Sequence, residues 1–250
     1  MLNNLKRKLK LILYKGTTYQ CPLCQYRCRD WAYSGVDVEV NKELEIIGAG
    51  RRKNICVSCG GNDRERLVYV FLQERIPTST WTQLNILHIA PEWNLSQWIA
   101  NQQTKTYVQG DRHMEGYQYD DSVQNMDITA LSFPEGQFDW IICNHVLEHI
   151  EEDSIAMREL HRVLKPGGSA ILQVPISRKI DKTYEDRTIQ SPEEREKHFG
   201  QNDHVRVYGN DYPKRLESAG FEVEEFTPTR SLLRSGLNPK EVVFYCHKKQ

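Results

Sequence analysis

The sequence predicts an α/β protein with a mainly parallel sheet, because a strand–helix–strand unit occupies its central part. Residues 140–143 form an apolar strand, and the acidic residues 151–153 suit the positive end of a helix dipole. Apolar residues then recur at helical spacing over residues 157–164. Turn-forming residues 165–168 stop this helix, and residues 170–176 resume as a buried strand. A crossover helix between two strands favours parallel pairing.

Length and charge limit how the chain is organised. Its 250 residues and 29.3 kDa accommodate one full α/β domain and a small module. Residues 1–80 carry 14 Lys and Arg against 8 Asp and Glu, whereas the remaining residues carry 19 against 26. A basic first part and an acidic remainder predict that contacts with phosphate-rich partners run through the N-terminal part.

No apolar stretch reaches the ~20 residues that span a bilayer. The apolar run at residues 11–14 is too short for a signal peptide, so we expect a cytoplasmic protein. Residues 2–14 are predicted to form a basic amphipathic helix, which could give a weak peripheral membrane contact. One short basic helix has marginal membrane affinity, so docking on the protein's own surface, or fraying, is favoured.

Four of the 7 cysteines form two Cys-x-x-Cys pairs, Cys21 with Cys24 and Cys56 with Cys59. Cysteines in a cytosolic chain point to metal binding more than to disulfides. Four thiolates complete a tetrahedral Zn²⁺ site and leave no position for water, so we predict a structural zinc ion. Cys28 could replace one ligand in an irregular site. Independent buried thiols are the alternative to a metal site.

The segment between the cysteine pairs is predicted to be a hairpin or a small sheet. Residues 36–40 and 44–47 have strand character and flank a polar turn. The 31 residues between Cys24 and Cys56 exceed the usual zinc-ribbon spacing, but a longer loop does not alter the coordination chemistry.

Residues 64–76 are predicted to form a long amphipathic helix that joins two domains. The expected division is a zinc-ribbon-like module with a basic helix at residues 1–62 and a core domain at residues 63–250. Arg64 and Arg66 on this helix could touch a substrate, although solvated or paired charges are the simpler interpretation.

The central motif also resembles a known family. The stretch FDWIICNHVLEHI, followed by HRVLKPGG, is similar to the fourth and fifth strand region of class I S-adenosylmethionine (SAM)-dependent methyltransferases. The resemblance implies a Rossmann-like, mostly parallel seven-stranded sheet with flanking helices. It also implies an antiparallel hairpin at the C-terminal edge, which residues 221–226 and 241–247 fit. An ordinary strand–helix–strand unit without SAM chemistry is the alternative, because topology alone does not assign function.

One part of the sequence departs from the family pattern. The first core strand, residues 83–90, is normally followed by a glycine-rich turn that lets the backbone approach the cofactor. Here His88 stands where the family has an acidic residue, and Ala90-Pro91-Glu92 replaces the glycines. Either Glu92 supplies the carboxylate from a remodelled turn, or the domain has lost SAM binding. We favour the first, because the other cofactor positions are present.

Those other positions follow from the resemblance. Asp111 ends the strand at residues 106–110, where a carboxylate can accept both ribose hydroxyls. Asp127 would meet the adenine amino group, and Ile128 would pack on the ring. Asn144 leaves the fourth strand beside the cofactor. Taken alone, each Asp could equally be a turn or capping residue.

The acceptor side is predicted to lie under a lid at residues 177–210, beyond the carboxyl end of a strand. His145 and His204 are the candidate general bases for removing a proton from the acceptor. His145 could instead orient Asn144.

The leading prediction is a SAM-dependent methyltransferase acting on a small-molecule or glycan-type acceptor, with structural Zn²⁺. The first alternative is an RNA methyltransferase, because some bacterial ribosomal-RNA methyltransferases also carry an N-terminal zinc ribbon. No long basic stripe interleaved with aromatic residues supports that alternative. The second is a non-catalytic interaction module whose cofactor turn has decayed.

Overall fold

A seven-stranded sheet forms the centre of the computed structural model, which describes residues 2–250, with the backbone alone for residues 2–4 and 231. The strand order is β12-β13-β9-β8-β5-β6-β7, and the strands from β9 to β7 pair in parallel, whereas β12 and β13 pair antiparallel. The predicted fold class is therefore confirmed. The bounds are β5 (Asn85–Ile89), β6 (Thr106–Asp111), β7 (Val123–Asn125), β8 (Phe138–Asn144), β9 (Leu164–Gln173), β12 (Glu222–Phe226) and β13 (Val243–His247).

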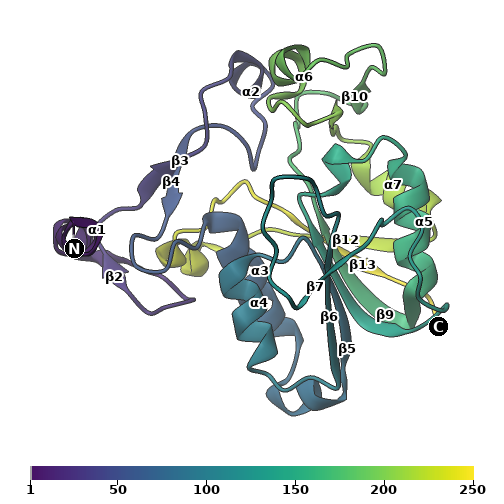
Figure 1. Cartoon of the computed structure of the whole chain (residues 1–250), viewed down its shortest axis with the longest axis horizontal. Coiled ribbons are helices and arrows are strands. Elements are labelled where there is room, and N and C mark those ends of the chain that lie inside the picture. Colours follow the sequence, from purple (N-terminus) through teal and green to yellow (C-terminus); the bar gives the residue numbers. More distant parts are fainter. Residues whose placement is uncertain (1) are drawn as a thin grey trace.

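Helices cover both faces of this sheet (Figure 1). One face carries α3 (Asp63–Arg75), the 3-10 helix η1 (Thr78–Gln83) and α4 (Trp93–Ala100). The other carries α5 (Asp153–Val163) and α7 (Tyr212–Ser218). Each set of helices buries its own apolar cluster against the sheet, which is the layering that a parallel sheet requires.

The stop signal after α5 produces a local irregularity in the sheet. Phe138 pairs with Leu164, but Trp140 pairs with Ser169, so the register shifts across the intervening Lys-Pro-Gly-Gly segment. Gly167 has a φ of 76°, a conformation that favours glycine. The predicted turn is therefore present within the bounds of β9.

The N-terminal part consists of two small antiparallel sheets and two helices. Its elements are α1 (Leu2–Tyr14), β1 (Lys15–Gln20), β2 (Arg27–Cys28), β3 (Ala32–Ser34), α2 (Glu39–Glu43) and β4 (Arg52–Ile55). The predicted hairpin at residues 36–40 and 44–47 is wrong, because α2 occupies its centre and the strands that pair are β3 and β4. The Asn41 side chain donates to the Gly200 carbonyl at 3.3 Å, so a distant contact helps to hold this segment as a helix.

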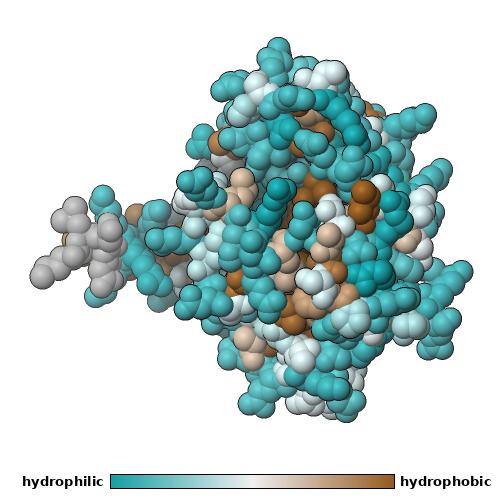
Figure 2. Space-filling view, turned by 45° about the vertical axis from the view of Figure 1, so that its right-hand side comes forward, coloured by the Kyte–Doolittle hydropathy of each residue, from teal (hydrophilic) through white to brown (hydrophobic). Residues whose placement is uncertain are grey.

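Helix α1 is formed as predicted, and Leu11 is half-buried, but four other apolar side chains of the helix point mostly to solvent. Leu5, Leu9, Ile12 and Leu13 are all more than half exposed. Among residues 2–250, no helix is long and apolar enough to cross a membrane. The face in Figure 2 is mostly hydrophilic, with apolar side chains gathered in its middle.

Helix α3 is buried almost all round, and its polar residues connect the two parts of the chain. The Arg66 guanidinium is fully buried and donates to the carbonyls of Asn54, Gly61, Ser235 and Gly236 at 2.8–3.0 Å. Four carbonyl partners satisfy the buried donors. Arg66 therefore holds the N-terminal part against the loop containing the 3-10 helix η3 (Arg230–Ser235) and is not available to a substrate.

The predicted lid is an ordered insertion after β9. It contains β10 (Tyr184–Glu185), α6 (Pro192–Phe199) and β11 (Arg206–Val207), and α6 lies beside α2 (Figure 1). Arg206 is buried and donates to carbonyls of Leu147, Ile150 and Glu151, next to the 3-10 helix η2 (Leu147–His149). These contacts fix this insertion, called the lid below, over the end of β8; its role in covering a substrate stays a prediction.

Candidate cofactor and acceptor sites

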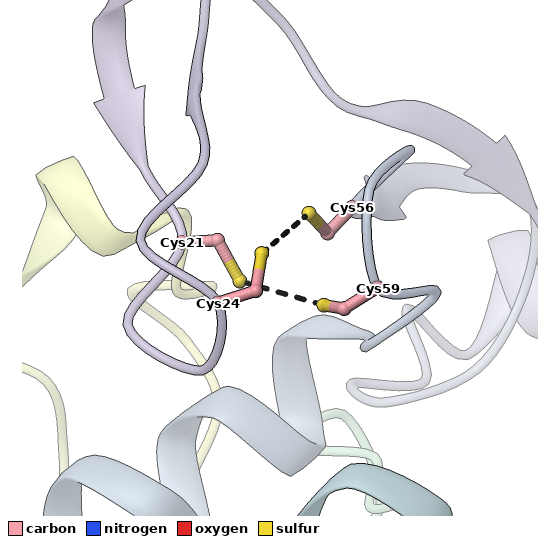
Figure 3. Close-up of side chains that lie close together, drawn as sticks. All are labelled: Cys21, Cys24, Cys56 and Cys59. Carbon is pink, nitrogen blue, oxygen red and sulfur yellow. Dashed lines mark hydrogen bonds between the residues drawn. The ribbon is translucent and has the colours of Figure 1, made fainter. Parts of the chain in front are cut away.

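Two loops bring the four predicted metal ligands together. Cys21 and Cys24 lie on the turn between β1 and β2, and Cys56 and Cys59 follow β4 (Figure 3). The Sγ atoms of Cys21 and Cys59 are 3.8 Å apart, and those of Cys24 and Cys56 are 3.7 Å apart. Sulfur ligands about 2.3 Å from a tetrahedral Zn²⁺ lie about 3.8 Å from one another. The four cysteines could therefore hold a zinc ion.

Cys28 lies outside this cluster among the described residues. It is buried in the same small apolar core as Trp31, and burial raises the pKa of its thiol to about 11. A buried, protonated thiol behaves as a small apolar side chain. The geometry therefore favours the two Cys-x-x-Cys pairs as ligands.

The predicted cofactor residues come together at the carboxyl ends of three neighbouring strands. Ile89 pairs with Gly110 on β6 and with Cys143 on β8, so the residues that follow these three lie side by side. They are Ala90, Asp111 and Asn144. This edge, beside the point where the strand order reverses, is where α/β sheets bind ligands.

Glu92 is fixed on this edge by two neighbours. One of its carboxylate oxygens lies 2.9 Å from Nε2 of the buried His88, and the other accepts from Asn144 Nδ2 at 3.2 Å. His88 in turn contacts the Tyr107 hydroxyl at 2.8 Å. Burial is the largest single effect and opposes ionisation of Glu92, but the hydrogen bond and charge of His88, together with hydrogen bonds from the Glu92 amide and Asn144, lower the pKa of the carboxyl overall. A half-buried carboxylate therefore occupies the remodelled turn, and the histidine at the family's acidic position supports it.

Ala90 adopts the backbone conformation that a glycine would allow more easily. Its φ is 48°, and its amide donates to the Gly110 carbonyl at 2.8 Å. An L-residue in this region costs about 1–2 kcal/mol. The turn thus places an alanine in the left-handed region that glycine favours.

We expect Ala90→Val to lower the free energy of unfolding by more than 1 kcal/mol, because a β-branched side chain is strongly disfavoured at this φ. Ala90→Gly should change it by less than about 1 kcal/mol, because relief of strain offsets the added flexibility of the unfolded chain. Urea unfolding of both variants checks this. Equal destabilisation by both substitutions would contradict a strained backbone at Ala90.

The remaining cofactor residues differ in their surroundings. Asp111 is half-buried and lines a cavity of about 190 Å³ with Pro91 and Trp93. Asp127 is exposed, and one carboxylate oxygen accepts from the amide and hydroxyl of Thr129 in a local turn, while Ile128 is buried. The turn role considered for Asp127 is thus present, and its other oxygen is available. Contact of Asp127 or Ile128 with adenine stays a prediction.

A second cavity, of about 300 Å³, lies at the ends of β8 and β9. Residues from the N-terminal part, the turn after β8 and the lid all contribute to its lining. Ile47 and Ile176 exchange two backbone hydrogen bonds of 2.8 and 3.1 Å, which close the N-terminal part over the core domain. The N-terminal part therefore forms a wall of this cavity.

Both predicted general bases line this cavity. His145 has a φ of 54°, and neither of its buried ring nitrogens has a hydrogen-bond partner among the described residues. Burial lowers the pKa of His145 well below its ordinary value and that of His204 to about 4. His145 does not bond to Asn144, whose amide donates to Glu92, so the orienting role considered for it is absent.

The sequence predictions missed Glu148 and His149, which line the same cavity. Both lie on η2, directly after His145, and burial raises the pKa of Glu148 to about 7. Their spacing of three and four residues from His145 was the available signal. Arg64, considered as a substrate contact, also lines the cavity, whereas Arg52 is paired with Asp63 at 2.8 Å.

Glu241 adds a pH-sensitive carboxyl beside this region. One of its oxygens accepts from Gln173 at 3.1 Å, and the other has no hydrogen-bond partner among the described residues. Burial raises its pKa from 4.5 to about 7. The folded state therefore holds this proton more tightly than the unfolded chain, and stability falls as pH rises from about 4.5 through 7.

We expect Glu241→Gln to leave stability unchanged below pH ~4.5 and to raise it by at most about 3 kcal/mol above pH ~7. Chemical unfolding across this pH range measures the difference. Glu43→Gln, at an exposed glutamate, is the matched control and should follow the parent protein. A difference that is already present at low pH would show that ionisation is not its cause.

This chain resembles known proteins both in sequence and in fold. Residues 96–172 match the model of a methyltransferase domain family. A SAM-dependent methyltransferase structure from Listeria monocytogenes is 15% identical and covers 75% of this chain and 99% of its own, with a TM-score of 0.50. A chain of the complex between the Haloferax volcanii Trm112 methyltransferase activator and a methyltransferase is 13% identical. It covers 75% of this chain and 92% of its own, also with a TM-score of 0.50. No curated protein matches the chain.

The fold is thus the Rossmann-like fold of class I methyltransferases. The domain match and this fold together support a SAM-dependent methyltransferase. The only evidence for a zinc-binding module is the cluster of four cysteines.

Proposed function

We propose that this protein transfers a methyl group from SAM to a small-molecule or glycan-type acceptor. The carrying observation is the geometry of the Glu92 carboxylate, which His88 and Asn144 fix at the carboxyl ends of β5 and β8. A carboxylate held there can accept hydrogen bonds from a cationic cofactor, because each oxygen keeps a second lone pair. Glu92 would thus bind the cofactor through its side chain at the turn where the family has glycines.

Bound SAM would supply a methyl group activated by its positively charged sulfur. Methyl transfer is an in-line displacement, so the protein's tasks are to position the acceptor and remove its proton. Asp111 would accept the ribose hydroxyls, with Asp127 and Ile128 at the adenine and Ala90 at the turn. Burial keeps His145 neutral near pH 7, so a ring nitrogen without a hydrogen-bond partner among the described residues can accept the proton, although the lowered pKa makes His145 a weaker base than an ordinary histidine.

The cavity beside His145 favours a compact acceptor. Its volume of about 300 Å³ is at the lower end of the range for small-molecule sites. Its walls carry the charged and polar residues Arg64, Glu148, His149 and His204. A polar acceptor with hydroxyl or amine groups fits this lining.

We expect His145→Ala to lower turnover by about 10²–10⁴-fold, the usual contribution of a general base. S-adenosylhomocysteine formation, measured with panels of hydroxyl, amine and glycan acceptors, provides the assay. His161→Asn is the matched control, because His161 packs on Phe221 at the far end of α5. Unchanged rates for both His145→Ala and His204→Ala would remove the base assignment, and turnover on RNA alone would favour the nucleic-acid alternative.

A further inference from the structure

Three side chains that the proposed cofactor site does not use converge in the acceptor cavity. Glu148 and His149 come from η2, and His204 comes from the lid. One ligand atom of each lies within 4.8 Å of the other two. Ligands about 2.1 Å from one ion are at most about 4.2 Å apart, so the three atoms lie close to the spacing of one coordination shell.

Both histidines are oriented as metal-binding histidines are. His149 Nδ1 lies 3.3 Å from the Asp203 carboxylate, and His204 Nδ1 lies 3.3 Å from the Phe199 carbonyl. Metal-ligating histidines usually donate one ring N–H to a carboxylate or a carbonyl, which leaves the other nitrogen for the ion. The same arrangement leaves Nε2 of each ring available here.

Glu148 supplies an independent indication of a ligand. It is 1% exposed, and its Oε2 atom has no hydrogen-bond partner among the described residues. Its other oxygen lies 3.3 Å from His145 Nδ1, without the geometry of a hydrogen bond. A buried carboxylate oxygen without a partner is costly, and a bound cation would remove that cost.

We propose that Glu148, His149 and His204 bind a divalent transition-metal ion, separate from the four-cysteine site. Imidazole with one carboxylate suits Zn²⁺ and related ions. Three protein ligands leave a position open, as in catalytic sites, whereas four thiolates do not. The Arg64 charge on the same cavity opposes a cation, and the carboxylates of Glu148 and Asp203 offset it.

All three side chains line the acceptor cavity, so an ion held by them would be able to bind an acceptor oxygen there; this step rests on the proposed methyltransferase function. A metal-bound hydroxyl loses its proton more readily than a free one. The proton would pass to His145, because His204 would be held by the ion, and the oxygen would form a bond to the methyl carbon. The carbon–sulfur bond breaks with its electron pair left on sulfur, so the ion itself undergoes no redox change.

Cobalt titration of the full-length, zinc-depleted protein separates the two sites. Co²⁺ that binds the thiolates restores the fold of residues 15–62 and gives an intense charge-transfer band, whereas Co²⁺ on imidazole and carboxylate gives no such band. We expect the parent protein to bind two Co²⁺ ions. Glu148→Gln and His204→Asn should each bind one and keep the charge-transfer band. His161→Asn, a histidine outside the cluster, should bind two. Asp203→Asn should weaken the second ion by about 10–100-fold, the usual effect of losing an orienting partner.

A single Co²⁺ in the parent protein, or two in both cluster variants, would overturn the proposal. Should the variants fail to fold, anomalous scattering from crystals of the parent protein grown with Zn²⁺ decides. A peak between Glu148, His149 and His204 supports the site, and a peak at the cysteines alone rejects it. S-adenosylhomocysteine binding by the same protein reports separately on the methyltransferase proposal.

Discussion

Replacing Cys56 with serine is expected to abolish the proposed structural zinc site and to unfold residues 15–62. Structural zinc sites contribute about 10–16 kcal/mol of apparent binding free energy in small domains, and loss of one thiolate removes most of it. Among the described residues, the buried core around the cysteines is otherwise limited to Cys28 and Trp31, so a bound metal would be the main source of stability of the two small sheets. Metal analysis and hydrogen exchange of residues 15–62 measure the effect.

The same change, Cys56→Ser, should open the acceptor cavity but leave the proposed cofactor residues in place on the central sheet. Residues 34–64 form one wall of that cavity, whereas Ala90, Asp111 and Asn144 lie on the central sheet. Cys28→Ser is the matched control, because Cys28 is buried in the same core but lies outside the cluster. Equal zinc content in the Cys56→Ser variant and its parent would show that the four cysteines are not the metal site.

Replacing Glu92 with glutamine should weaken SAM binding by about tenfold to a hundredfold. A hydrogen bond to a charged group contributes about 1.5–3 kcal/mol, and each 1.4 kcal/mol is a factor of ten in affinity. Glutamine preserves the shape of the side chain, but it removes the negative charge and places a donor where His88 or Asn144 needs an acceptor. Equilibrium dialysis with labelled SAM gives the affinity ratio.

Glu74→Gln, at an exposed glutamate on α3, removes the same charge away from the site and should bind SAM as the parent does. His88→Gln should give an intermediate loss, because Glu92 would keep its charge but lose one support. If Glu92→Gln bound SAM with unchanged affinity, the carboxylate would not be the replacement for the glycine turn.

The fold could be predicted because its signals are local. The strand–helix–strand unit around α5 carries its own helix start, apolar spacing and stop, and all three are present in the structure. Helix α2 could not be predicted in the same way. Valine alternation at residues 36–40 favours a strand, but contacts such as that of Asn41 with Gly200 come from residues more than 150 positions away.

The candidate site likewise has a part that could be predicted from the sequence and a part that could not. Register alone brings Ala90, Asp111 and Asn144 to one edge, as the sequence predicted. The acceptor cavity depends on the approach of the lid and the N-terminal part to η2. His204 could be predicted from its residue type, whereas Glu148 and His149 reach the cavity only because the lid and the N-terminal part approach η2, and these contacts join residues distant in the sequence.

The most direct test of the central claim is calorimetric titration of S-adenosylhomocysteine, the product of the methyl donor, into the full-length protein. Binding of one molecule per chain is predicted, because Glu92, Asp111 and Asn144 are already assembled on the strand ends. The absence of binding to the folded, zinc-loaded protein would contradict the methyltransferase proposal and would favour a non-catalytic module.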